Sequence, residues 1–389
     1  MAVSADLKPI LLVALGGNAL IKKGQIGTID EQFVNLRLPV RQIARLCRDW
    51  RLIITHGNGP QVGNLLLQQE CCDQVPKLPL EILVAQTEGQ IGYMIESSLD
   101  EALMEMGIAY RPLISLITYV VVDENDPAFA APDKPIGPAF SEPEAAALPY
   151  PTMKTAKGWR RVVASPEPVT IVEKREIRQL MEMDFIVICC GGGGIPVIRH
   201  GRAFEGVDAV IDKDLASARL ALDVGADMLL IVTDVPGAMR DYGGPGETLL
   251  NRLSVAEARR HLAAGHFPPG SMGPKVEACL RFMEGGGRRA AITSLETILE
   301  AVADKAVGTQ WIGGSKMTDE PFFSPLAALA AAHHGDVVGD FLHDEVAPQG
   351  VGELFVRRRR TGGLRDEAPY LCQGSVNSGS VGRHVSSWP

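Results

Sequence analysis

Short runs of nearly continuous apolar residues, separated by longer stretches of helical character, constrain the fold of this chain most strongly. The runs are PILLVAL (9–15), RLIITHGNGP (51–60), PLISLITYVVV (112–122), FIVICC (185–190) and MLLIVT (228–233). Strands that are apolar throughout, rather than at alternate positions, are typical of a parallel sheet covered on both faces. Helical patterns over 31–50 and 80–107 lie between the runs. The alternation predicts a layered α/β fold.

Composition excludes several other classes of protein. The chain has 389 residues, of which 46% are hydrophobic and 22% charged, which is ordinary globular usage. A net charge of −9 argues against broad nucleic-acid binding. No run approaches the ~18 apolar residues of a membrane-spanning helix. The seven cysteines form no C-x-x-C pair, and the N-terminal run is interpreted as a strand rather than an export signal. We therefore expect a cytoplasmic protein with reduced thiols and no membrane partner.

Two segments break the alternation of strands and helices. Residues 123–168 are rich in proline and alanine and are interpreted as a small insert or lid. Its basic residues are Lys134, Lys154, Lys157, Arg160 and Arg161. From Gly313 onward the pattern stops, and we interpret 313–389 as a poorly ordered extension. Its RRRR run (357–360) is expected to be a solvated charge run, with a patch for nucleic acid or acidic lipid as the alternative.

Three of the apolar runs end in glycine-rich turns: LGGN (15–18), HGNGP (56–60) and GGGG (191–194). Glycines at the carboxyl ends of parallel strands let backbone N–H groups approach an anion, and a helix N-terminus after the turn adds favourable charge. One such turn could be an ordinary strand–helix connection. Three together favour a phosphate-rich ligand. The chain lacks both GxxxxGK[ST] and GxGxxG, which disfavours P-loop and dinucleotide-binding proteins.

Two lysines at expected helix starts suggest phosphoryl transfer, which needs cations near the moving group. Lys213 is flanked by acids in VIDKD, and Lys275 comes just after Gly-Pro. Each could instead be a solvated helix-end lysine. Asp214 could orient a lysine or hold Mg²⁺, or merely complement the helix dipole. His56 could be a general base, although a hydrogen-bonded histidine at a strand end is the favoured interpretation.

The chain resembles carbamate kinase, a member of the amino-acid kinase superfamily, over about residues 8–312. The motifs that carry the resemblance occur in order: VALGGNAL (13–20), THGNGPQVG (55–63), KPIGP (134–138), GWRRVVASPEP (158–168), CCGGGGIPV (189–197), GVDAVIDKDLASARLA (206–221) and GSMGPKVEA (270–278). Superfamily relatives that phosphorylate carboxylates place a lysine just before the first glycines. Here Ala14 and Leu15 stand in that place, which favours carbamate as the acceptor.

The resemblance implies a three-layer αβα sandwich around a mainly parallel sheet. It implies one kinase domain over 1–312, with 123–168 as a small protruding subdomain over the active site. An N-terminal lobe would bind carbamate or carbamoyl phosphate, and a C-terminal lobe would bind ADP or ATP. Mg²⁺ would be carried with the nucleotide, and no side chain is expected to bind it directly. It also implies a homodimer, with a contact near 80–106.

The resemblance assigns site residues motif by motif. Lys213 and Lys275 would contact the transferred phosphoryl group, and Asp214 would hold both lysines. The residues expected to bind substrate and phosphate are Gly16, Gly17, Asn18, Gly57, Asn58, Gly59, Gly191, Gly192, Gly193, Lys134 and Arg161. The turn from Gly191 to Gly194 would form the floor between the lobes. The residues expected to bind nucleotide are Thr233, Asp234, Val235, Tyr242, Ser271, Met272 and Gly273.

The activity that the resemblance implies is reversible phosphoryl transfer between ADP and carbamoyl phosphate, in arginine or related nitrogen catabolism. Two alternatives stay open at this point. One is another amino-acid kinase with a different small acceptor. The other is a catalytically silent subunit that binds nucleotide.

Overall fold

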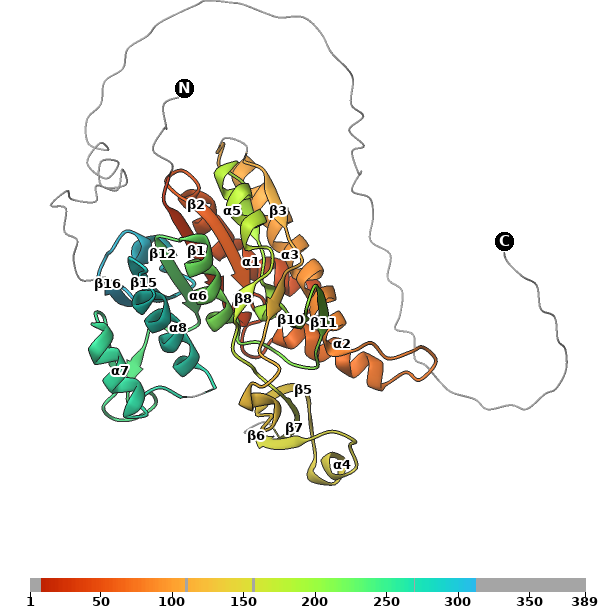
Figure 1. Ribbon diagram of the computed structural model, residues 1–389. Helices are drawn as coiled ribbons and strands as arrows, with labels where there is room; N and C mark the ends of the chain where they lie inside the picture. The colour runs from red at the N-terminus through yellow and green to blue at the C-terminus, as the bar shows by residue number, and fades with distance from the viewer. Residues whose placement is uncertain (1–7, 109–110, 156–157, 269, 313–389) are drawn as a thin grey trace, which may run out of the picture. The chain divides into compact units, whose positions relative to one another are not determined.

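The computed structural model describes residues 8–108, 111–155, 158–268 and 270–312. The expected extension, 313–389, lies outside these residues. Within them, a seven-stranded sheet forms the centre (Figure 1). Every neighbouring pair in it is parallel except the last pair at one edge, β15 and β16. In spatial order the strands are β16 (Thr309–Ile312), β15 (Arg289–Ser294), β12 (Met228–Thr233), β1 (Ile10–Leu15), β2 (Arg51–His56), β9 (Ile186–Ile188) and β3 (Leu113–Ser115).

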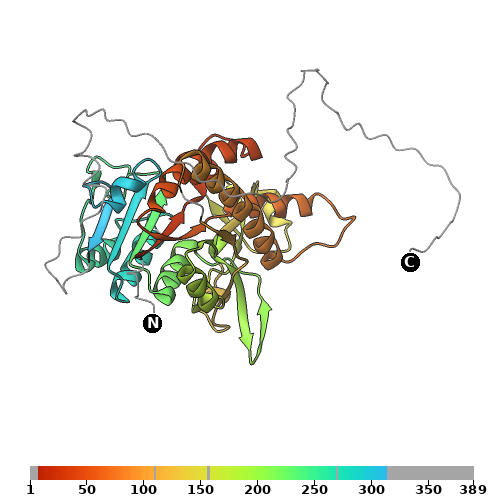
Figure 2. The same cartoon turned by 90° about the horizontal axis from the view of Figure 1, so that it is seen from above.

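Helices cover both faces of this sheet, as Figure 2 shows from above. One face carries α1 (Ile29–Leu46), α3 (Leu80–Glu105) and α9 (Ile298–Val302), and the other carries α5 (Lys174–Glu182), α6 (Lys213–Val224) and α8 (Met272–Glu284). Strand β1 shows why both layers are needed. Leu11 and Val13 enter the first apolar core, whereas Leu12 and Ala14 enter the second. A strand that is apolar at every position needs a cover on each side. The predicted αβα sandwich is confirmed.

The apolar run 112–122 forms two strands rather than one. Its first half is β3, and its second half is β4 (Tyr119–Val121), which belongs to a separate four-stranded sheet. That sheet contains, in order, β11 (Ala203–Gly206), β10 (Ile195–His200), β4 and β8 (Thr170–Ile171). The break falls at Thr118, whose carbonyl and hydroxyl accept the backbone N–H groups of Ile195 and Cys190. The backbone there turns away from the main sheet to make these bonds.

The segment 123–168 contains a small sheet apart from the central one. This sheet is antiparallel and consists of β5 (Lys134–Phe140), β7 (Gly158–Val163) and β6 (Thr152–Thr155), with the short helix α4 (Glu142–Ala146) beside it. It lies below the central sheet in Figure 1. Strand β5 packs against α2 (Gly59–Glu70) so closely that a Cβ on Gly63 would lie 3.4 Å from the Cα of Gly137. The insert is thus attached to the main body through α2.

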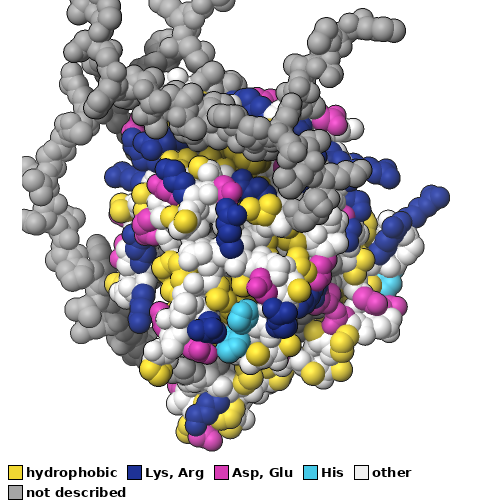
Figure 3. Space-filling model, turned by 90° about the vertical axis from the view of Figure 1, so that its left-hand side faces the viewer, with side chains coloured by type: hydrophobic (Ala, Val, Ile, Leu, Met, Phe, Trp, Pro, Cys, Tyr) yellow, Lys and Arg dark blue, Asp and Glu magenta, His cyan; other side chains and the backbone are white. Residues whose placement is uncertain are grey.

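The remaining elements lie around α8. They are α7 (Val255–Ala263) and the small hairpin of β13 (Met239–Arg240) and β14 (Thr248–Leu249). Figure 3 shows the face of the molecule on this side. Basic and acidic side chains are mixed across it, so the described part of this face presents no broad field of one sign. Among the described helices, none is long and apolar enough to cross a membrane.

Candidate active site

The three glycine turns meet at the carboxyl edge of the central sheet, where β1, β2 and β9 end side by side. At some of their positions, neighbouring atoms leave no room for a side chain. A Cβ on Gly57 would lie 3.2 Å from the backbone N of Gly17, and one on Gly192 would lie 2.1 Å from Asn58 Nδ2. Gly192 also has a φ of +67°, which favours glycine. Close packing therefore requires glycine at Gly57 and Gly192, whereas a Cβ on Gly59 would meet no atom within 4 Å.

Hydrogen bonds within the fold decide which backbone amides can donate to a ligand. The N–H of Gly16 is donated to Val232 O at 3.0 Å, and that of Gly57 to Leu15 O at 3.1 Å. These two glycines thus contribute close approach rather than donation. Apart from the N–H of Gly191, which faces the Glu88 carboxyl, five N–H groups of these turns make no hydrogen bond within the described residues, namely those of Gly17, Asn18, Asn58, Gly59 and Gly192. These N–H groups are available to donate hydrogen bonds to an anion bound at this edge of the sheet.

The turns differ in the element that each one enters. HGNGP leads directly into α2, whose N-cap is Asn58. LGGN leads into a single 3-10 turn at Gly17–Ala19, and GGGG leads into strand β10. No helix N-terminus follows GGGG, because the β-branched residues of IPVI continue as a strand. Helix-dipole attraction for an anion acts here through α2.

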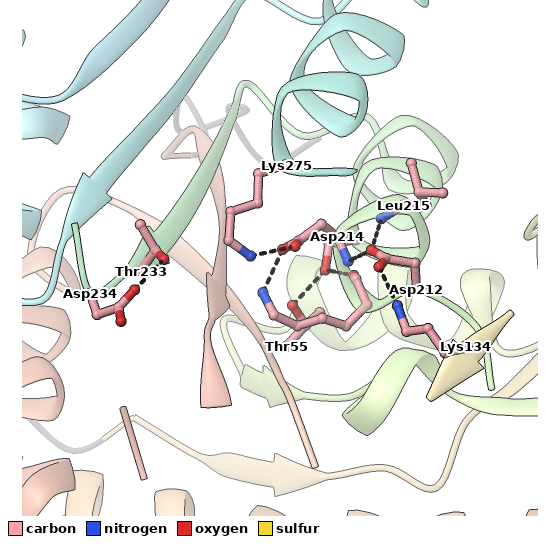
Figure 4. Close-up of polar contacts among 10 residues, drawn as sticks. Thr55, Lys134, Asp212, Asp214, Leu215, Thr233, Asp234 and Lys275 are labelled. Carbon is pink, nitrogen blue, oxygen red and sulfur yellow. Dashed lines mark hydrogen bonds and ion pairs between the residues drawn. The ribbon is translucent and has the colours of Figure 1, made fainter. Parts of the chain in front are cut away.

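The buried carboxylate of Asp214 lies between the two expected lysines, of which Figure 4 labels Lys275. Asp214 Oδ1 accepts from Lys213 Nζ at 2.5 Å, and Asp214 Oδ2 accepts from Lys275 Nζ at 2.8 Å. The Asp214 side chain is 4% exposed. Lys213 is the first residue of α6, and Lys275 lies in the first turn of α8, so two helix starts converge on one carboxylate. The structure brings together the three residues that the sequence assigned to catalysis.

The electrostatics keep this cluster charged. Burial alone would raise the pKa of Asp214, but the two ammonium groups together hold it well below its usual range. Burial lowers the pKa of Lys213 and is partly offset by Asp214. For Lys275, burial is outweighed by Asp214 and neighbouring acids, so its pKa is raised. Two positive charges therefore share one negative charge, which leaves a net positive site for a phosphoryl group.

The insert is tied to this cluster through the segment that precedes α6. Asp212 caps α6 by accepting the backbone N–H of Asp214, and its other oxygen accepts from Lys134 Nζ at 2.9 Å. Arg161, on β7, pairs with Asp208 at 2.7 Å, and its guanidinium lies 4.9 Å from the ring centroid of Tyr150. Lys134 thus belongs to the cluster, whereas Arg161 anchors the insert at its edge.

A pocket of about 200 Å³ adjoins the lysine cluster. Its lining residues are Thr233, Asp234, Val235, Met239, Tyr242, Pro268, Ser271, Met272 and Lys275. Six of the seven residues expected to bind nucleotide are among them. The exception is Gly273, whose N–H donates to Pro268 O and so helps shape the loop instead. Because Lys275 lines the pocket and contacts Asp214, the pocket opens onto the cluster.

Sequence reasoning misses three groups near the site. Thr55 Oγ1 and Ser217 Oγ lie 2.7 Å apart, and Ser217 donates to Lys213 O, which connects β2 to the start of α6. Asp212 stands out in the sequence only as a neighbour of Lys213, although its position just before a helix is a usable capping signal. Glu88, on α3, is buried beside the GGGG turn. Nothing in the local sequence marks Glu88.

His56 lies at the end of β2, with Nδ1 3.2 Å from Gly57 O. It is buried, and burial lowers its pKa to about 4. It is therefore a neutral histidine at ordinary pH, as a hydrogen-bonded strand-end residue would be.

The described residues contain no cluster of three or more His, Cys, Asp or Glu side chains that could hold a metal ion. The carboxylates of Asp212 and Asp214 are already paired with lysines. Asp234 lines the pocket and makes no ion pair within the described chain. This donor set fits an ion that arrives on nucleotide phosphates rather than one held by the protein alone.

Comparison with known proteins agrees with this arrangement. The model of the amino acid kinase family matches residues 9–294. Carbamate kinase of Thermococcus kodakarensis is 47% identical over 310 residues, covering 77% of this chain and 98% of that protein. Carbamate kinase 1 of Enterococcus faecium is 44% identical over 306 residues, covering 77% and 97%. The structure of carbamate kinase from Giardia lamblia bound to AMP-PNP aligns with a TM-score of 0.73 at 36% identity, covering 79% and 99%. The chain belongs to the amino acid kinase family, in its carbamate kinase branch.

Proposed function

We propose that this chain catalyses reversible phosphoryl transfer between carbamoyl phosphate and ADP. A β-phosphate oxygen of ADP forms a bond to the phosphorus as the bond from phosphorus to the carbamate oxygen breaks. The products are ATP and carbamate, which decomposes to CO₂ and ammonia. The observation that carries the proposal is Asp214, which holds Lys213 and Lys275 beside the pocket that Lys275 lines. Curated carbamate kinases at 41–47% identity support the choice of reaction.

Catalysis in this arrangement comes from positioning and positive charge. Transfer of a phosphoryl group passes through a loose, in-line transition state with charge on the equatorial oxygens. The ammonium groups of Lys213 and Lys275 would neutralise that charge, while Asp214 keeps them apart and fixed. Since both lysines are held before substrate binds, little reorganisation is needed during the reaction.

The acceptor side would be formed by the glycine turns and the insert. The free N–H groups of Gly17, Asn18, Asn58 and Gly59 would donate to the oxygens of the carbamate and phosphate groups. The turn at 191–194 would form the floor beneath them. Lys134 would add positive charge from the insert, and Arg161 would hold the insert in place through Asp208.

The nucleotide side would be the 200 Å³ pocket. Tyr242 and Met272 offer apolar surface for a base, and Lys275 marks the end at which phosphates would lie. The binding of AMP-PNP, an ATP analogue, by the Giardia lamblia enzyme supports nucleotide binding here. Mg²⁺ carried on the phosphates would supply further positive charge near Asp234, whose carboxylate makes no ion pair with any described residue.

Four further assignments extend this proposal. We expect residues 1–312 to suffice for activity, a cytoplasmic location, and a role in arginine catabolism. We also expect a homodimer that uses α3 and α1, which expose apolar side chains at Tyr93, Val34 and Leu38. Sedimentation velocity of the purified chain tests the dimer, and an activity assay of a chain truncated after Ile312 tests the domain limit.

The acceptor is tested by measuring ATP formation from ADP with carbamoyl phosphate and, in parallel, with acetyl phosphate. The account predicts a strong preference for carbamoyl phosphate. Equal use of the two donors would favour another acceptor chemistry. Tight ADP binding without turnover of either donor would favour a catalytically silent relative.

A further inference from the structure

Glu88 differs from the other buried acids of the described chain. Asp214 is paired with two lysines, and Asp223 is paired with Arg219 and Lys174. Glu88 is 4% exposed and has no basic partner among the described residues. A buried carboxylate without a cation is costly, so this position calls for an explanation.

The contacts of Glu88 connect two segments that shape the site. Its Oε2 accepts the backbone N–H of Thr118 at 3.1 Å. The N–H of Gly191 faces the same carboxyl from the glycine turn, although Oε1 makes no hydrogen bond of ordinary geometry within the described residues. Thr118 in turn accepts the N–H groups of Cys190 and Ile195. Glu88 and Thr118 together therefore hold the backbone at both ends of the turn 190–195.

This turn needs such support because its backbone is unusual. Cys190 is a non-glycine residue with φ of +50°, and Gly192, Gly193 and Gly194 also have positive φ. A conformation of this kind persists only when its surroundings fix it. A Cβ on Gly191 would lie 2.6 Å from His56 Nε2 and 2.9 Å from Glu88 Cγ. The backbone of the turn therefore packs directly against the Glu88 and His56 side chains.

We propose that Glu88 is a positioning residue for phosphoryl transfer, which acts as an uncharged carboxylic acid that fixes the glycine turn beneath the acceptor. The inference rests on the proposed function. Being uncharged matters because a carboxylate behind the turn would repel an anionic acceptor. Burial, the largest influence, raises the pKa of Glu88 well above its ordinary value and outweighs the backbone N–H groups of Thr118 and Gly191, which lower it. Two other titratable groups near the turn are also kept uncharged: the hydrogen bond with Cys189, together with burial, raises the pKa of Cys190, and burial lowers the pKa of His56.

Two substitutions separate this role from a merely structural one. Glu88→Gln keeps an acceptor for Thr118 and places an amide where the acid proton would be. Glu88→Ala removes both. The account predicts that Glu88→Gln retains kcat/KM for carbamoyl phosphate within about threefold of the wild type, whereas Glu88→Ala lowers it at least ~10-fold, mainly through KM. The KM for ADP should stay unchanged in both, because the turn lies on the acceptor side.

A pH profile and a spectrum complete the test. The wild type and Glu88→Gln should show superimposable profiles of kcat/KM between about pH 6 and 8. An infrared difference spectrum of the two proteins should contain the carbonyl stretch of one protonated carboxyl group. Glu96→Gln, about two turns further along α3, is the matched control, since Glu96 accepts from Ser115 away from the turn.

Several outcomes would overturn the inference. Equal damage by Glu88→Gln and Glu88→Ala in folded protein would mean that a charge is needed. Unchanged kinetics in Glu88→Ala would remove the positioning role. A carboxylate band in place of the protonated one would contradict the uncharged state, and this readout needs no activity. An inactive wild type would instead contradict the proposed function.

Discussion

Lys213 and Lys275 donate to opposite oxygens of the buried Asp214 carboxylate. The distance from Nζ is 2.5 Å to Oδ1 for Lys213 and 2.8 Å to Oδ2 for Lys275. The two lysines come from the starts of two different helices, α6 and α8. Isolated lysines would swing freely in solvent and lose side-chain entropy on binding a phosphate. Here Asp214 has already ordered them, so the fold itself provides the preorganised charge that phosphoryl transfer requires.

Removing one of these lysines should stop most turnover without unfolding the protein. We expect Lys275→Ala to lower kcat at least ~100-fold, which corresponds to about 2.7 kcal/mol of transition-state stabilisation. Circular dichroism and a thermal melt check the fold, and a coupled ATP assay measures kcat. Lys305→Ala, at an exposed lysine, is the control. Near-normal turnover in Lys275→Ala would contradict the proposal that Lys275 contacts the transferred phosphoryl group.

Neutralising Asp214 should change the pH dependence of the reaction. Asp214 raises the pKa of Lys275, so Asp214→Asn lowers it. Activity that needs the protonated lysine is lost as pH rises through that pKa, and the loss should therefore begin at a lower pH in the variant. We also expect kcat to fall at least ~10-fold at neutral pH. Asp304→Asn, which alters a pair with exposed Arg252, is the control. An unchanged alkaline limb would contradict the account.

His56 should make the fold less stable in mild acid. Its pKa in the folded chain is about 4, below the ordinary 6.5, so between these values the unfolded chain binds the extra proton. Stability from this group is present above pH 6.5 and falls as the pH drops toward 4, by about 3 kcal/mol in all. Urea unfolding at several pH values should show this loss in the wild type and not in His56→Gln. The exposed His200→Gln serves as the control, and an identical slope in His56→Gln would refute the assignment.

Tyr242 should affect nucleotide binding rather than chemistry. It lines the pocket while remaining 58% exposed, as expected for a side chain that would cover a bound base. We expect Tyr242→Ala to raise the KM for ADP about five- to tenfold, or roughly 1 kcal/mol, with kcat little changed. Phe204→Ala, at an exposed aromatic on β11, controls for general loss of surface. An unaltered KM for ADP would show that the nucleotide base binds away from Tyr242.

Lys134 should act on the acceptor side alone. Its ion pair with Asp212 joins the insert to the cap of α6. Lys134→Ala is expected to raise the KM for carbamoyl phosphate about tenfold and to leave the KM for ADP unchanged. Lys154, an exposed lysine of the same insert on β6, offers a matched control. Equal effects on both KM values would indicate a general loss of structure instead.

Much of the fold and of the site could be predicted because local residues determine them. Apolar residues on every position of β1 require cover on both faces, which already predicts the sandwich. Lys213 and Lys275 could be placed at helix starts from Asp-Lys-Asp and Gly-Pro-Lys. The convergence of these two helices on Asp214 depends on the path of the chain between them, so family resemblance predicts it and local pattern does not.

The remaining features depend on contacts between distant segments. The run 112–122 divides at Thr118 because that residue bonds to the turn 190–195, which is distant in the sequence. Glu88 becomes notable only when α3 packs against the same turn. The donation of Gly16 and Gly57 N–H groups to Val232 and Leu15 likewise results from strand pairing. No local sequence pattern in either of the contacting segments predicts these contacts.

The most direct test of the central claim is a rate measurement on the full-length protein. Purified chain is mixed with ADP, carbamoyl phosphate and Mg²⁺, and ATP is measured over time, with Lys275→Ala in parallel. The account predicts steady ATP formation by the wild type and at least ~100-fold less by the variant. Folded wild-type protein that binds ADP yet forms no ATP from carbamoyl phosphate would contradict it.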